Sequence, residues 1–223
     1  MTRIAIVSLA VCLTCHAASA QDAPRIFVGG LFGVSTLSAD SRSATTGSDA
    51  ALSLYKPENG AAVNLFAGIH VARYFSLQGN WMWNRNDVTL VSSYVTPQGG
   101  GFYEQRRRSS QNAAVLDGLI YFRSLDSVVR PYLGTGLSLL RFSSADVVGS
   151  SSRGLAAPSG AIASTHVGLR SHVGIDVRLS RRLEFRYSFS ETISSNPISG
   201  SLSPPAPRGL ANFQNLFGAI ARF

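Results

Sequence analysis

The sequence predicts an all-β fold, an eight-stranded antiparallel up-and-down transmembrane β-barrel with a polar, filled lumen. Three observations predict it. The last strand alternates with a period of two and ends on an aromatic residue, the first residues have the pattern of an export signal, and the connections between candidate strands alternate in length. Strands that enter a membrane must close into a ring, because an open sheet edge is prohibitively costly in lipid.

Residues 1–20 have the organisation of a secretory signal peptide. Arg3 precedes the apolar run Ile4–Leu13, and Ala18-Ser19-Ala20 supplies the small residues that signal peptidase accepts. The run is too short to span a bilayer as a helix. We therefore expect a signal peptide over residues 1–20 and a β-barrel domain over residues 21–223.

Composition and net charge limit the classes of binding partner that we expect. Both cysteines, Cys12 and Cys15, lie in the expected signal peptide, so neither a disulfide nor thiol chemistry is expected of the mature chain. The net charge is +8, but an exported chain without a nucleic-acid-binding motif is not expected to meet nucleic acid. A phosphate-bearing lipid surface is the better match for the positive charge.

The first three candidate strands cover residues 25–37, 63–72 and 77–84. The first has apolar residues on both faces, so its facing is ambiguous. In the second, Val63 and its alternate neighbours are apolar while Asn64 and His70 fall on the other face. In the third, Trp81 and Trp83 alternate with polar residues. In the second and third candidate strands, one face therefore tolerates polar side chains.

The next three candidates cover residues 112–122, 131–142 and 166–179. Asp117 fixes the inner face of the fourth strand. Pro131 at the start of the fifth costs no ladder hydrogen bond. The sixth has the clearest alternation, with Val, Leu and Ile on one face and His, Gly, Arg and Asp on the other.

The last two candidates cover residues 182–189 and 210–223. The seventh sets aromatic residues against Glu184 and Arg186. The eighth ends on Phe223, with Arg222 on the opposite face. Both strands therefore have one apolar and one tolerant face, as a barrel wall between lipid and lumen requires.

The connections alternate in length. Those after the second, fourth and sixth strands are short, near Tyr74, at residues 124–128 and at Ser180-Arg181, whereas the other connections are long and rich in Ser, Gly and Pro. Outer-membrane barrels have short periplasmic turns and long extracellular loops, so we expect both termini on the periplasmic side. The aromatic residues Trp81, Trp83 and Tyr187 are expected in the interfacial girdles.

A soluble sandwich is the alternative that periodicity alone permits. Its charged faces would meet water and its apolar faces would meet a second sheet. The signal peptide, the terminal aromatic residue and the alternating connections favour lipid outside and a polar lumen inside.

Three segments carry a resemblance to a known family: Val28–Gly33, Pro131–Gly136 and Leu210–Phe223. They resemble the small eight-stranded outer-membrane barrels related to the OmpA transmembrane domain and OmpX. The resemblance implies a monomer in the bacterial outer membrane, assembled by the barrel-assembly machinery that reads a C-terminal aromatic strand. Phe217 and Phe223 are the expected assembly signal. The peptidoglycan-binding domain of full-length OmpA is not expected, because no residues follow Phe223.

Six charged residues fall on the predicted inner faces. An eight-stranded barrel is just wide enough for side chains to fill, so these residues are expected to pair across the lumen. The expected charge network comprises Asp117, Arg170, Asp176, Arg178, Glu184 and Arg186. A conducting pore lined by the same residues is the alternative. His166 and His172 share this face and are expected as satisfied lumen histidines, with no metal and no cofactor.

Arg106, Arg107 and Arg108 fall in the expected loop between the third and fourth strands, beside the glycines of residues 99–101. Three adjacent guanidinium groups suit lipid phosphates, including those of lipopolysaccharide. The alternative is a solvated loop that aids solubility. The glycines are expected to form a flexible linker.

No enzymatic activity is expected. The lipid A deacylase barrels resemble this chain in size and in the terminal Phe, and they use a His-x-Ser pair, but His70, His166 and His172 are followed two residues later by Ala or Gly. The expected function is a structural, adhesion or surface-recognition role in the outer membrane. A narrow channel for small solutes and a lipid-modifying enzyme remain the alternatives.

Overall fold

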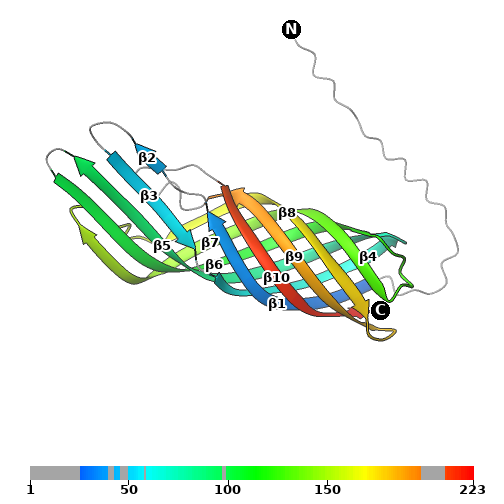
Figure 1. Ribbon diagram of the computed structural model, residues 1–223. Coiled ribbons are helices and arrows are strands. Elements are labelled where there is room, and N and C mark those ends of the chain that lie inside the picture. Colours follow the sequence, from blue (N-terminus) through cyan, green and yellow to red (C-terminus); the bar gives the residue numbers. More distant parts are fainter. Residues whose placement is uncertain (1–25, 40–42, 46–49, 58, 97–98, 197–208) are drawn as a thin grey trace, which may run out of the picture.

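Eight strands pair in a closed antiparallel ring in the computed structural model (Figure 1). The structure describes residues 26–39, 43–45, 50–57, 59–96, 99–196 and 209–223. The expected signal peptide, residues 1–20, lies outside this part of the chain. The predicted up-and-down barrel is confirmed.

The ring strands follow one another in chain order, and the last pairs with the first. They are β1 (Ile26–Ala39), β4 (Asn59–Ala72), β5 (Phe75–Thr96), β6 (Gly99–Tyr121), β7 (Val129–Arg153), β8 (Ile162–Arg178), β9 (Leu183–Ser195) and β10 (Gly209–Arg222). Two further strands, β2 (Ser43–Thr45) and β3 (Ala50–Pro57), lie between β1 and β4 in the chain and outside the ring, where β3 pairs with β5.

The facing of β1 is settled by packing. Phe27 and Leu31 are buried inside, whereas Ile26 and Phe32 are exposed on the outer face. The Phe27 ring lies 4.8 Å from the ring of His70 on the neighbouring strand β4, centroid to centroid, so an aromatic contact on the inner face selects this facing.

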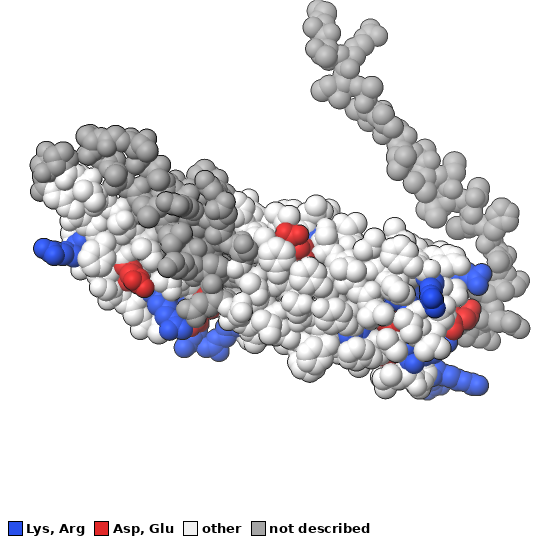
Figure 2. Space-filling view, viewed as in Figure 1, with Lys and Arg blue, Asp and Glu red and all other residues white. Residues whose placement is uncertain are grey.

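The outer face has an apolar band at the end of the barrel where the short connections lie. On β5, β6 and β7 this face is apolar up to Trp83, Ala114 and Leu139, and two residues further along the strands it becomes polar. About nine residues of each strand therefore cross the band, which matches a tilted strand in a bilayer. Most charged side chains in Figure 2 gather toward the two ends of the barrel.

Beyond the band, three strands continue where long loops were expected. The register of β5 with β6 runs from Phe75↔Ile120 to Thr96↔Gly99, and β7 stays paired with β6 as far as Ser152. We call this extension the arm: residues 85–96, 99–110 and 143–153, together with β3 (Figure 1). The glycine-rich segment of residues 99–101 is thus part of a strand, and the expectation of a flexible linker was wrong. Turn-forming Ser and Gly are tolerated here because neighbouring strands satisfy the backbone.

The short connections are confirmed at residues 73–74, 122–128 and 179–182. The start of β1 and the end of β10 lie at this end too, where the Phe223 amide donates to the Ile26 carbonyl over 2.9 Å. We refer to it as the short-turn end. Among the described residues no helix is long and apolar enough to cross a membrane.

Candidate functional site

The lumen holds three sets of charged side chains, and the first centres on Asp117. Arg170 Nη1 lies 2.5 Å from Asp117 Oδ2, and Asn80 Nδ2 donates to the same oxygen over 2.9 Å. His172 Nε2 lies 3.4 Å from it. All four side chains are buried, and the carboxylate of Asp117 on β6 is held by partners from β5 and β8.

The second set joins β8 and β9. Arg186 forms a bidentate contact with Asp176, in which Nε donates to Oδ1 over 2.6 Å and Nη2 donates to Oδ2 over 2.8 Å. The Tyr121 hydroxyl donates to Asp176 Oδ2 over 3.0 Å, and Arg186 Nη1 donates to Gln78 Oε1 across the lumen over 2.7 Å. These groups form a hydrogen-bonded bridge through the barrel interior.

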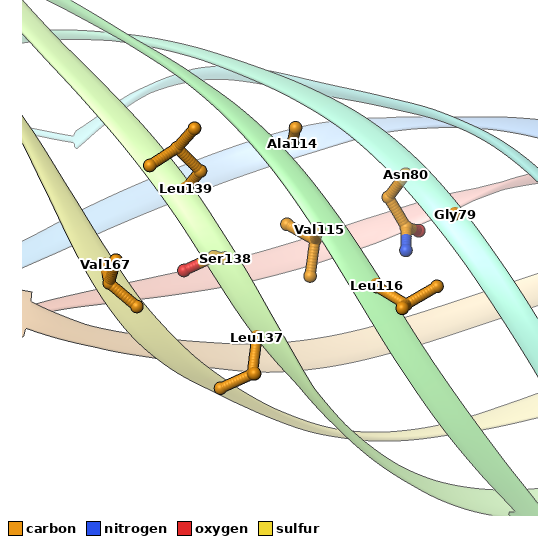
Figure 3. Close-up of a pocket in the computed structure, with 9 residues that line it drawn as sticks. All are labelled: Gly79, Asn80, Ala114, Val115, Leu116, Leu137, Ser138, Leu139 and Val167. Atoms are coloured by element: carbon orange, nitrogen blue, oxygen red, sulfur yellow. The ribbon is translucent and has the colours of Figure 1, made fainter.

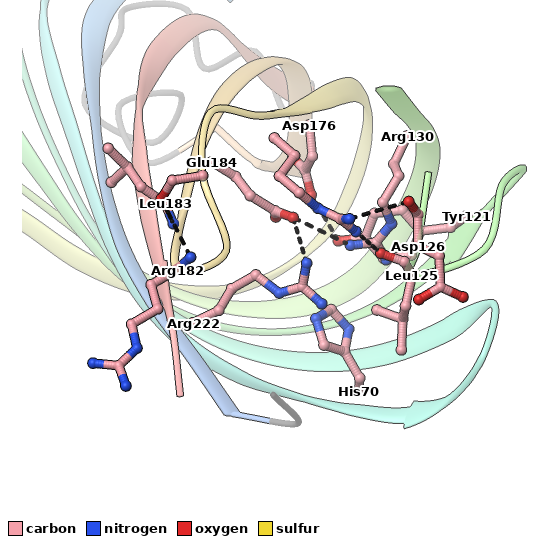
Figure 4. Close-up of polar contacts among 12 residues, drawn as sticks. His70, Tyr121, Leu125, Asp126, Arg130, Asp176, Arg182, Leu183, Glu184 and Arg222 are labelled. Carbon is pink, nitrogen blue, oxygen red and sulfur yellow. Dashed lines mark hydrogen bonds and ion pairs between the residues drawn. The ribbon is translucent and has the colours of Figure 1, made fainter. Parts of the chain in front are cut away.

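The third set lies nearest the short-turn end (Figure 4). Arg222 Nη1 donates to Glu184 Oε1 over 2.7 Å, and Arg130 Nη1 lies 3.9 Å from the same oxygen. The Arg130 guanidinium also stacks on the Tyr121 ring, with its carbon 3.9 Å from the ring centroid. A cation–π contact therefore supplements a long ion pair.

Arg178 does not join these sets, contrary to the prediction. Its guanidinium donates to the backbone carbonyls of Leu125 and Asp126 in the turn before β7. At the rim of the barrel, turn carbonyls are nearer than any lumen carboxylate, so Arg178 secures a connection. Sequence reasoning missed Arg130 and Arg222, although alternation with Pro131 and Phe223 places both on the inner face.

Glycines opposite aromatic rings complete the filling of the lumen. Gly134 pairs with His172, and Gly174 pairs with Tyr132. A Cβ on Gly134 would stand 2.0 Å from His172 Nε2, and one on Gly174 would stand 2.4 Å from the Tyr132 hydroxyl. The absent side chains make room for the rings, which lie across the neighbouring strand. His166 faces Leu140 higher on the same two strands.

Arg107 is fully buried, which corrects the expectation of a free loop arginine. Its guanidinium donates to the backbone carbonyls of Ser144, Pro158 and Gly160 over 3.1, 3.0 and 2.5 Å, and to Gln105 Oε1 over 2.9 Å. Burial lowers the pKa of this guanidinium from its ordinary value. The side chain points inward because strand alternation puts it on the face opposite Arg106 and Arg108.

These hydrogen bonds hold the β7–β8 connection at the arm end of the barrel. Leu155, Ala157 and Ile162 pack there against an apolar cluster that includes Tyr103 and Phe142. The three charged sets therefore lie toward the short-turn end, while this apolar cluster lies where the lumen meets the arm, beside buried amides such as Asn86 and Gln111.

Arg106 and Arg108 face outward. Arg106 Nη2 lies 3.2 Å from Asp87 Oδ2, with side chains 50% and 27% exposed. Arg108 is exposed and stands between Asp87 and Asp146 in the sheet register. Binding of lipid phosphate by these two arginines stays a prediction, and acidic neighbours offset their charge.

The outer face of the barrel carries a groove of about 600 Å³ within the apolar band (Figure 3). Its outward-facing lining is apolar, comprising Gly79, Ala114, Leu116, Leu137, Leu139 and Val167. Asn80, Val115 and Ser138 also border it, but their side chains are buried on the lumen side. Two residues further toward the arm, Asn112, Arg141 and Thr165 form the next row of the sheet.

A histidine and a serine do meet inside the barrel. His70 Nδ1 lies 2.6 Å from Ser76 Oγ, but both side chains are buried, so the hydroxyl is out of reach of a lipid substrate. In the described part of the chain, no group of three or more His, Cys, Asp or Glu is arranged to hold a metal ion.

The expected assembly residues, Phe217 on β10 and Phe223 directly after it, are exposed. The Phe217 ring lies 4.3 Å from the Phe32 ring on β1, centroid to centroid, and Phe223 follows the last strand residue at the short-turn end. Trp81 and Tyr187 are exposed on the outer face, where the Tyr187 hydroxyl donates to Asn215 Oδ1 over 3.0 Å.

Comparison with known proteins gives one family and several similar structures. The family model for the outer membrane protein beta-barrel domain matches residues 5–205. Neisserial surface protein A (NspA) is 15% identical, with a TM-score of 0.54 over 89% of this chain and 97% of that one. The outer membrane protein OprG from Pseudomonas aeruginosa is 13% identical, with a TM-score of 0.54 over 90% and 96%. The comparison with curated proteins gave no match.

Proposed function

Because this chain belongs to the family of outer membrane protein β-barrel domains, which places it in the bacterial outer membrane, we propose that it is a non-conducting barrel that displays its arm for surface recognition or adhesion. In such barrels the short turns face the periplasm. The arm then projects from the outer leaflet to the cell exterior.

The arm is the single observation that carries this proposal. It is a continuous sheet rather than a set of separate loops, since β5, β6 and β7 remain paired far beyond the apolar band. From Ala145 to Arg153, β7 pairs only with β6 among the described residues, so its other edge is open. An open strand edge is a template for pairing with an extended segment of a partner.

The filled lumen favours a non-conducting barrel over the narrow-channel alternative. Arg186 spans from Asp176 to Gln78, and the Tyr121 and Tyr132 rings lie in the same part of the interior. The side chains that would line a pore occupy it instead. The burial of Ser76 favours a binding role over the lipid-modifying enzyme.

The partners that we propose beyond a surface ligand are those of the membrane itself. They are outer-membrane lipids, including lipopolysaccharide, and the barrel-assembly machinery during biogenesis. The closed ring leaves no unpaired strand edge within the apolar band, which supports a monomer.

The test removes the outer part of β5 and β6 from the arm and keeps the barrel. Residues 90–105 are replaced by Asn-Gly, which suits a two-residue hairpin between Thr89 and Arg106. The control replaces only residues 95–100 by the same turn. Attachment of expressing bacteria to immobilised matrix protein and to one another should fall for the first variant and persist for the control, with both barrels still heat-modifiable on gels.

Two results would overturn the proposal. One is attachment by the arm-truncated strain equal to that of the parent. The other is discrete conductance steps from the purified parent protein in planar bilayers, which would establish the channel.

A further inference from the structure

The groove on the outer face of β5–β8 is hollow because its floor is made of small residues. A Cβ added to Gly79 would have no heavy atom within 4 Å apart from those of Gly79 and its two chain neighbours, and Ala114 on β6 is the other small residue of the floor. The walls, Leu116, Leu137 and Val167, are each more than 60% exposed. An apolar depression in the part of the barrel that crosses the bilayer faces lipid chains.

A cation stands directly at the arm end of this groove. Arg141 follows the wall residue Leu139 by two positions on the same face of β7, about 7 Å along the strand. Its neighbours in the row are Asn112 and Thr165, which are uncharged. Arg141 is exposed and forms no hydrogen bond or ion pair with another described residue.

Arg141 differs in this respect from the arginines further along the arm. Arg106 is engaged by Asp87, and Arg108 lies between two aspartates. The next row beyond Arg141 contains Ser143, Ser110 and Arg85, so a second cation stands one row higher and two strands away. Strand spacing puts the Cα atoms of the two arginines roughly 12 Å apart. This spacing suits a headgroup with more than one anionic group.

We propose that this face binds one phosphate-bearing lipid of the outer leaflet, with an acyl chain in the groove and a phosphate on Arg141. The guanidinium binds two phosphate oxygens, Asn112 donates its amide, and Arg85 contacts a second anionic group of the headgroup. The inference narrows to one site the lipid partnership proposed above. It does not depend on the arm having a protein partner.

Lipid binding is measured by native mass spectrometry in maltoside detergent, which carries no phosphate. The probes are bisphosphorylated lipid A, the same lipid without phosphates, and inorganic phosphate. Arg141→Gln should weaken lipid A binding roughly tenfold, and removal of the phosphates from the lipid should do the same to the parent. Higher salt should weaken binding to the parent more than to Arg141→Gln, because salt screens an exposed charge.

The groove is tested separately by Gly79→Phe, which fills it, and by Ala114→Leu as a milder change. Both should reduce lipid A binding and leave heat-modifiable migration intact, since neither residue faces the lumen. Arg153→Gln, an exposed arginine at the far end of β7, serves as the control and should bind as the parent does.

Three outcomes would overturn the site. Arg141→Gln binding lipid A like the parent would remove its phosphate contact, and undiminished binding by both groove variants would remove its acyl contact. Inorganic phosphate competing as well as lipid A would reduce it to a general anion site. A variant that loses arm-dependent attachment but still binds lipid A, or one that loses lipid A binding but still attaches, would show that the lipid site and the surface-recognition role are independent.

Discussion

The Asp176 carboxylate receives three hydrogen bonds, two from Arg186 and one from Tyr121, in the interior of the barrel. Desolvation of both charges offsets much of their attraction, so the pair contributes less to net stability than its short distances suggest. Removing one partner is different, because it leaves the other charge buried and without compensation.

Asp176→Asn should therefore lower the free energy of unfolding by about 3–5 kcal/mol. The matched control is Asp87→Asn, which removes one ion-pair partner of the partly exposed Arg106 and should cost less than about 1 kcal/mol. Urea titration of the protein in lipid vesicles measures both. Similar losses for the two variants would mean that the lumen bridge is as weakly coupled as a surface pair.

At this scale the sequence predicts which face a residue occupies but not which partner it finds. Alternation correctly put Asp117, Asp176 and Arg186 inside, because a strand has only two faces. It could not separate Arg178, which lies at the rim and bonds to turn carbonyls. That distinction depends on the position of a residue along the barrel axis, which strand tilt and shear determine.

Among the strands, β10 is the one that closes the ring. It pairs with β9 on one side and β1 on the other, and its outward face carries Phe213 and Phe217. The Phe223 amide hydrogen bond to Ile26 fixes the register of the closing pair at the short-turn end.

Phe223→Ser should lower the yield of folded protein in the outer membrane several-fold, because it removes the aromatic ring at the interface of the closing strand. Phe102→Ser changes an exposed Phe in the arm and should leave the yield near that of the parent. The folded fraction is read from heat-modifiable migration of the membrane fraction. Equal yields would show that the terminal ring is dispensable for assembly.

The strand lengths show where sequence reasoning stopped at this scale. The eight ring strands and their order were predictable, since each has an apolar outer face that must meet lipid. The arm was not, because beyond the band both faces can be polar and Ser-rich stretches such as residues 149–152 also suit turns. The inward side of Arg107 followed only once the segment was known to be strand.

For the whole molecule, the lipid and aqueous environments divide one continuous sheet. Val173 on β8 lies within the apolar band and is 47% exposed, while Val148 on the arm is 52% exposed. The two side chains have similar exposure in the isolated protein. Only the surrounding membrane distinguishes them.

Val173→Arg should destabilise the protein in lipid by about 2–4 kcal/mol, the cost of a cation near the bilayer midplane. Val148→Arg should change stability by no more than about 0.5 kcal/mol, because its side chain meets water. Unfolding free energies in vesicles give both values. Equal effects at the two positions would contradict the placement of the band.

The pairing of β1 with β10 has a consequence for when the barrel can form. Seven of the eight strand pairs in the ring join consecutive ring strands, but Phe27↔Arg222 joins residues from the two ends of the described chain. The first strand therefore cannot complete its pairing until the last strand is present. Contacts between residues so far apart in the sequence form slowly. An outer-membrane chain must cross the periplasm during that wait with its lipid-facing side chains uncovered. Its residence time there, rather than the stability of the finished ring, should limit how fast cells can produce it.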